Sequence, residues 1–79
     1  MKTATERELA EALRERLRII ADGNSRRDPD AHMQRLREIS ARIDSLARSL
    51  PRPINAQLAH YLSRHSYEKA LAVLERRLP

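Results

Sequence analysis

The sequence predicts an all-α fold, a small three-helix bundle built as one domain from residues 1–79. Apolar residues recur at steps of three and four over most of the chain, which is the period of an amphipathic helix. Capping residues and prolines flank these stretches and indicate where the helices begin and end. No stretch alternates apolar and polar residues at the period of two that is typical of a β-strand.

The first helix is expected over residues 5–22. Its apolar stripe consists of Leu9, Leu13, Leu17 and Ile20. Two pairs near its start fit the capping box, in which a hydroxyl and a carboxylate satisfy free backbone N–H groups: Thr3 with Glu6, and Thr5 with Glu8. Gly23 is expected to end the helix in the left-handed conformation, which glycine adopts without a steric penalty from a Cβ atom.

The second helix is expected over residues 29–50. Asp28 fits the N-cap, and Pro29 fits the first helical position, where its missing N–H costs no hydrogen bond. A heptad seam follows, made of Leu36, Ile39, Ile43, Leu46 and Leu50. Pro51 ends the helix, because the residue before a proline is disfavoured in the helical conformation. The short polar connection between the two helices predicts that they form an antiparallel hairpin.

A third helical segment is expected over residues 54–78 and would cover the apolar surface that the hairpin leaves open. Its period slips, because Leu58 and Leu62 define one face whereas Leu71, Leu74 and Leu78 define another. The pattern fits either one kinked helix or two short helices that meet near residues 63–66. In the second case Ser66 would be the N-cap of the last helix.

The composition limits the functions that the chain can serve. A chain of 79 residues forms only a thin core, with little material for the deep pocket that most enzymes use. We therefore expect no catalytic activity, no cofactor and no small-molecule substrate. The absence of cysteine excludes disulfides and thiolate metal sites. Because the sequence has no apolar run long enough for a membrane span and no apolar leader, the cytoplasm is the expected location.

Histidines and acidic residues give no sign of a metal site or a catalytic pair. His60 and His65 are five residues apart, which places their rings on different sides of a helix, so no metal site is expected. The acidic residues mostly lie three or four positions from an arginine and are interpreted as surface ion pairs. Examples are Arg7 with Glu11, Glu11 with Arg14, Glu38 with Arg42, and Asp44 with Arg48.

The net charge of +5 and the isoelectric point of about 10.7 favour an acidic partner, which could be nucleic acid, an anionic membrane or an acidic protein surface. The whole excess lies in residues 31–79, which carry nine basic and four acidic side chains. Nearly all the basic residues are arginines, which bind both carboxylate and phosphate in bidentate geometry. The charge therefore does not decide between a partner that offers carboxylates and one that offers phosphates.

The expected function is protein–protein interaction or self-assembly, with the chain itself as one partner in a homodimer. Besides the seam of the second helix, apolar residues fall outside the main stripes at Ile19, Met33 and Val73. The residues expected to bind the partner are Arg35, Arg42, Tyr61, Arg64, His65 and Tyr67. The alternative is a basic accessory domain that contacts DNA or RNA phosphates non-specifically through the same arginines. No signature motif of a known family is matched, and no membrane partner is expected.

Overall fold

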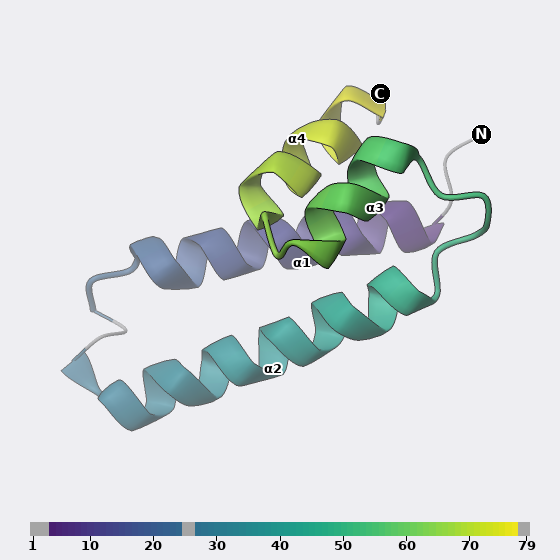
Figure 1. The fold of residues 1–79 in the computed structure, drawn as a ribbon. Coiled ribbons are helices and arrows are strands. Elements are labelled where there is room, and N and C mark those ends of the chain that lie inside the picture. The colour runs from purple at the N-terminus through teal and green to yellow at the C-terminus, as the bar shows by residue number, and fades with distance from the viewer. Residues whose placement is uncertain (1–3, 25–26, 78–79) are drawn as a thin grey trace.

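Two helical hairpins of unequal length make up the fold (Figure 1). The structure, a computed structural model, describes residues 4–24 and 27–77. The long hairpin consists of α1 (Ala4–Ala21) and α2 (Pro29–Arg48), and the short one consists of α3 (Ala56–Ser63) and α4 (Tyr67–Arg77). The short hairpin lies on the long one through α4, which packs against α1, while α3 packs against α4. The described residues contain no strand, and the prediction of an all-α fold is confirmed.

The first two predicted helices agree with α1 and α2 to within two residues at each end. The third segment is broken, because α3 ends at Ser63 and α4 begins at Tyr67. Of the two alternatives for residues 54–78, the structure therefore has two short helices rather than one kinked helix. Ser66 directly precedes α4, and its carbonyl oxygen accepts a hydrogen bond from the Ala70 N–H at 2.9 Å, as an N-cap carbonyl does.

Side-chain caps begin two of the helices. The Asp28 carboxylate accepts a hydrogen bond from the Ala31 N–H at 3.2 Å, which confirms it as the N-cap of α2. The Asn55 side chain does the same for α3, accepting from the Leu58 N–H at 3.0 Å. The predicted capping box of Thr3 with Glu6 lies partly outside the described residues. Thr5 lies inside α1, so the predicted capping box of Thr5 with Glu8 is wrong.

Asp22, rather than Gly23, organises the turn that ends α1. The prediction of a left-handed Gly23 is wrong, because its φ angle is not positive. Instead the Asp22 N–H donates to the Arg18 carbonyl at 3.0 Å, and the Asp22 carboxylate accepts from the Asn24 N–H at 3.0 Å. The Asp22 side chain thereby replaces a backbone acceptor in the turn, a role for which aspartate is well suited.

Among the described residues, the left-handed one is His65, with a φ angle of 57°. The Ser66 N–H donates to the Tyr61 carbonyl at 2.8 Å, and the His65 N–H donates to the Leu62 carbonyl at 3.2 Å. These two hydrogen bonds form the Schellman motif, which satisfies the last carbonyls of a helix and reverses the chain. Glycine usually occupies the left-handed position, so a histidine there carries a steric cost.

The core fills only one end of the long hairpin. α1 contributes buried residues as far as Leu13, and α2 contributes only Ile43. Leu50 follows the end of α2 and is also buried. α4 supplies the largest share, with Tyr67, Ala70, Leu71, Val73 and Leu74 buried. The prediction that Val73 adds to surplus surface is therefore wrong, because α4 turns this residue into the core.

The other end of the long hairpin has no core of its own. No described residue between positions 14 and 42 is buried. This part, residues 14–24 and 27–42, is called the open half of the hairpin below. It extends beyond the short hairpin on the side of the connection between α1 and α2 (Figure 1). The free energy of folding therefore comes mainly from the end that α4 covers.

Replacing a core residue with alanine should lower the free energy of unfolding far more than replacing an open-half residue. Leu13→Ala removes a completely buried side chain and is expected to lower the free energy of unfolding by about 2–5 kcal/mol. Met33 is 48% exposed, and Met33→Ala is expected to change the free energy of unfolding by less than about 0.5 kcal/mol. Urea unfolding followed by circular dichroism measures both. A large cost at Met33 would contradict the absence of a core in the open half.

His65→Gly should stabilise the protein. Glycine adopts the left-handed conformation without a Cβ clash, so the free energy of unfolding is expected to rise by about 1 kcal/mol. His65→Ala keeps the Cβ atom and is the matched control, for which no such gain is expected. The same urea titration would refute the left-handed assignment if both variants behaved alike.

Candidate interaction surface

A groove runs along the open half of the long hairpin between α1 and α2. Its volume is about 510 Å³, and no residue of α3 or α4 lines it. α1 contributes Glu15, Arg18, Ile19 and Asp22, and α2 contributes Arg35, Glu38, Ile39 and Arg42. These eight residues define what is called the groove below. Because the short hairpin does not reach it, the groove is accessible from outside.

Helical periodicity brings these side chains together. Glu11, Glu15, Arg18 and Asp22 follow one another at steps of four, three and four, so they share one face of α1. A different face of α1 meets the short hairpin, where Arg14 Nη2 lies 3.4 Å from Glu75 Oε2 of α4. On α2, Arg35 and Arg42 are seven residues apart and lie on the same face.

The charges of the groove balance, with three arginines and three carboxylates. Arg18 Nε donates to Glu15 Oε2 at 3.1 Å, and Gln34 Nε2 donates to Glu38 Oε1 at 3.0 Å. The α1 side becomes more acidic away from the connection, because Glu8 and Glu11 line an adjoining hollow that also includes Arg42. The groove is therefore a mixed-charge surface with an acidic α1 side.

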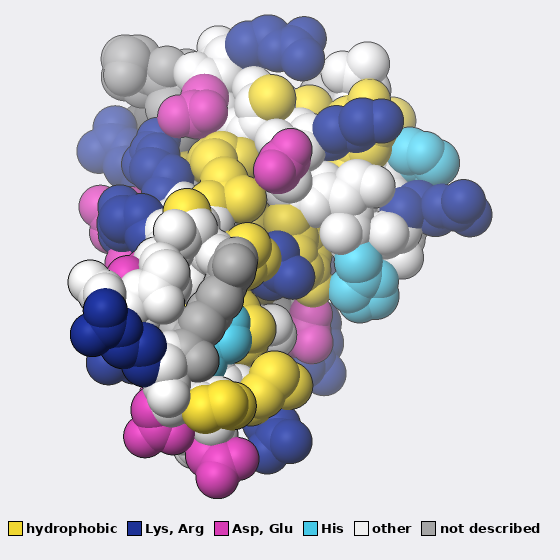
Figure 2. All heavy atoms as spheres, turned by 90° about the vertical axis from the view of Figure 1, so that its left-hand side faces the viewer, with side chains coloured by type: hydrophobic (Ala, Val, Ile, Leu, Met, Phe, Trp, Pro, Cys, Tyr) yellow, Lys and Arg dark blue, Asp and Glu magenta, His cyan; other side chains and the backbone are white. Residues whose placement is uncertain are grey.

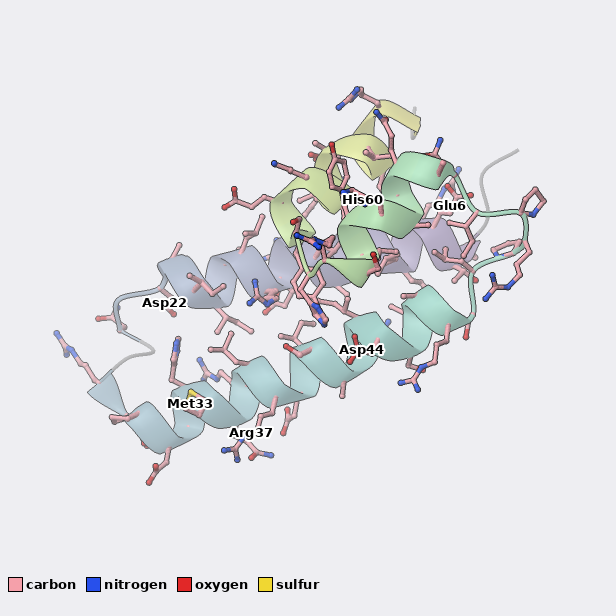
Figure 3. All side chains as sticks on the ribbon, in the orientation of Figure 1. Glu6, Asp22, Met33, Arg37, Asp44 and His60 are labelled. Atoms are coloured by element: carbon pink, nitrogen blue, oxygen red, sulfur yellow. The ribbon has the colours of Figure 1, made fainter. Side chains whose placement is uncertain are left out.

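Apolar side chains lie between these charges. Ile19 and Ile39 line the centre of the groove and are half-buried. Elsewhere in the open half, the half-buried large apolar residues are Leu17, Ile20 and Leu36. Met33 lies on α2 near the connection between the long helices (Figure 3). Seen from this end of the molecule, hydrophobic side chains reach the surface between basic and acidic ones (Figure 2). The open half is thus a partly apolar surface bordered by charges.

The structure divides the six residues predicted to bind a partner into two groups. Arg35 and Arg42 line the groove. The other four, Tyr61, Arg64, His65 and Tyr67, lie around the junction of α3 and α4. The groove contains no residue of the second group, so the predicted residues do not form one continuous site.

The two tyrosines at the α3–α4 junction are covered by cationic side chains. The guanidinium carbon of Arg16 lies 4.8 Å from the ring centroid of Tyr67, and Lys69 Nζ lies 5.9 Å from that of Tyr61. Tyr67 is buried in the core, whereas Tyr61 is half-buried and His65 is exposed. Tyr67 therefore joins α4 to α1 through Arg16.

Comparison with known proteins gives no match, since no family model fits the sequence and no curated protein or solved structure is significantly similar to the chain. Within residues 4–24 and 27–77, no group of three histidine, aspartate or glutamate residues could hold a metal ion. No described helix is long and apolar enough to cross a membrane. The function must therefore be argued from the surface itself.

The four ion pairs predicted from spacing do not form, although the structure describes all the residues involved. Arg14 pairs with Glu75 on α4 and not with Glu11. Arg48 Nε donates to the Asp44 backbone carbonyl at 3.3 Å and not to its carboxylate. Because an exposed pair of this kind contributes only about 0.2–0.5 kcal/mol, local packing easily overrides it.

Sequence reasoning missed the α1 side of the groove. The signal was present, because Glu11, Glu15, Arg18 and Asp22 recur at helical spacing. Deciding that this face remains open required knowing which face of α1 the short hairpin covers. Arg14 and Arg16 flank Glu15 in the sequence, yet both of them contact α4.

Alkaline pH should destabilise the protein through Tyr67. Burial raises the pKa of the Tyr67 phenol above its ordinary value of 10.0, nearby Asp44 adds to the rise, and Arg16 opposes it. The stabilisation is fully present below pH 10.0 and is lost as the pH rises through the higher folded pKa, because the unfolded chain ionises first. Asp44 lies on the side of α2 toward this junction (Figure 3).

Tyr67→Phe tests this expectation. The variant should lose less stability than the unchanged protein between pH 9 and pH 11, a window that brackets the ordinary phenol pKa of about 10. Thermal unfolding over this range measures the difference. Tyr61→Phe is the control, since it also removes one phenol but leaves Tyr67 in place. Equal alkaline loss in both variants would show that Tyr67 is not the group responsible.

Proposed function

We propose that the chain is a helical interaction module that binds a protein partner through the open half of its long hairpin. One observation carries this proposal: no described residue between positions 14 and 42 is buried, although this stretch holds several large apolar side chains. The open half resembles half of a helix-packing interface. A partner that lays a helical surface on it would complete that interface.

Energetics supports a partner for this surface. Full burial of a large aliphatic side chain contributes about 1.5–3 kcal/mol, and the side chains of the open half gain only part of this in the isolated chain. Single exposed apolar residues are normal on protein surfaces. In the open half, however, Ile19 and Ile39 line one groove. Contiguous apolar surface bordered by polar residues is typical of interaction sites.

The charge of the groove favours a protein over a nucleic acid. A phosphate-binding surface needs an excess of cations, because its affinity comes from neutralising phosphates. Arg35 and Arg42 are accompanied by Glu15, Asp22 and Glu38 in the same groove, which removes that excess. The net charge of +5 lies elsewhere on the surface, for example on Arg37, which extends from α2 away from α1 (Figure 3). We place this activity in the cytoplasm, where a chain without cysteine needs no oxidising environment.

Site-specific photo-crosslinking in cells tests the proposed function. A photoreactive amino acid placed at Ile19 or Ile39 should give covalent adducts of discrete mass, because both positions line the groove and a bound partner would lie against them. Gln57 is an exposed position on α3 outside the groove and serves as the matched control. Adducts of equal yield at all three positions, or at none of them, would refute the proposal.

Nucleic-acid binding makes a different prediction. Because the groove has no net charge, we expect little binding of labelled duplex DNA or mixed RNA at near-physiological salt. Fluorescence anisotropy at low and near-physiological salt measures this. Tight binding that weakens steeply with salt would instead support the basic accessory domain predicted as the alternative.

A further inference from the structure

The two sides of the groove carry opposite charge. Along α1, the acidic residues of the groove and of the hollow that adjoins it are Glu8, Glu11, Glu15 and Asp22, with Arg18 as the one cation. Along α2, the cations are Arg35 and Arg42, with Glu38 as the one carboxylate. Glu8, Glu11 and Arg42 form no ion pair with any described residue. Each side is therefore electrostatically complementary to the other.

We propose that the partner is a second copy of this chain, docked groove to groove about a two-fold axis parallel to the long hairpin, an inference that rests on the proposed function. Such an axis places α1 of one copy over α2 of the other, in antiparallel orientation. The acidic side of each copy then meets the basic side of the other. A two-fold axis perpendicular to the helices would instead place α1 over α1 and bring the acidic sides together.

The position of the residues along the hairpin gives specific contacts. Arg42 lines the same hollow as Glu8, Glu11 and Glu15, so its position along the hairpin falls within the stretch of α1 that these three residues span, about 10 Å. Rotation about an axis parallel to the hairpin leaves the position of each residue along that axis unchanged. Arg42 of one copy therefore faces Glu11 and its acidic neighbours on the other copy. The symmetry repeats this contact once, and it places Ile19 and Ile39 of both copies at the centre.

The size of the surface indicates a weak dimer. The α1 face from Glu8 to Asp22 is about 20 Å long, and two helices side by side are about 20 Å wide. An interface of this size falls at the lower end of specific protein interfaces, where transient complexes are found. No residue of α3 or α4 lines the groove, so the short hairpins stay clear of this contact.

Two charge-reversal variants test the dimer. Arg42→Glu places a glutamate opposite Glu11, and Glu11→Arg places an arginine opposite Arg42, so each variant brings like charges together in its own homodimer. Both positions are exposed, so the monomer fold should be unaffected. Sedimentation equilibrium should show the dissociation constant of each homodimer raised on the order of tenfold, because the repulsive contact occurs twice.

Mixing the two variants should restore association. In the mixed dimer, Glu11 of one chain faces Arg42 of the other, and the introduced Glu and Arg face each other. The dissociation constant of this heterodimer should return to within about threefold of the unchanged chain. Arg37→Glu makes the same charge change outside the groove and should leave dimerisation unchanged. Circular dichroism of all variants checks that they remain folded.

Three results would overturn the inference. The unchanged chain could stay monomeric over a hundredfold concentration range, the charge-reversal variants could dimerise as well as the unchanged chain, or their mixture could fail to recover. In each case, crosslinking of Ile19 or Ile39 to a different protein would still support the proposed function. Loss of crosslinking at both positions would refute the proposed function itself.

Discussion

The packing of α4 on α1 is the contact on which the rest of the structure depends. Leu13 of α1 and Leu74 of α4 are completely buried, and α3 joins the molecule by packing on α4. The 11 residues of α4 extend about 16 Å, whereas the 18 and 20 residues of α1 and α2 extend about 27 and 30 Å. A helix as short as α4 cannot cover the whole long hairpin. The open half is thus a direct consequence of the break between α3 and α4.

The sequence indicated either a kink or a break here and did not decide between them, because the apolar residues change phase between Leu62 and Leu71. The sequence also predicted the bounds of the long helices well, because Asp28, Pro29 and Pro51 are strong boundary signals. The residue that reverses the chain could not be predicted in this way. Glycine is the usual left-handed residue, yet Gly23 is not left-handed and His65 is. The Schellman hydrogen bonds and the docking of α4 together impose this conformation, so tertiary structure overrides the preference of the single residue.

The candidate site was predictable only where one helix suffices to define it. Arg35 and Arg42 share a face of α2 by their spacing alone, and both line the groove. The α1 side of the groove depends on how the two hairpins pack against each other. The apolar period of one helix does not determine that packing. Tyr67 illustrates the same limit, because its residue type is typical of interfaces but its ring lies in the core beneath Arg16. Residue type indicated which side chains could bind a partner, and the packing of the helices determined which of them are exposed.

The separation of core and groove has a thermodynamic consequence. Because the open half contributes little buried area, its residues can serve binding without weakening the end that α4 stabilises. A partner that covers Ile19 and Ile39 would in turn stabilise the folded chain, since anything that binds only the folded state shifts the folding equilibrium. The charges of the groove would then serve two purposes. They would keep a partly apolar surface hydrated in the free chain, and in the proposed complex they would fix which helix lies over which, because a register that pairs like charges is disfavoured.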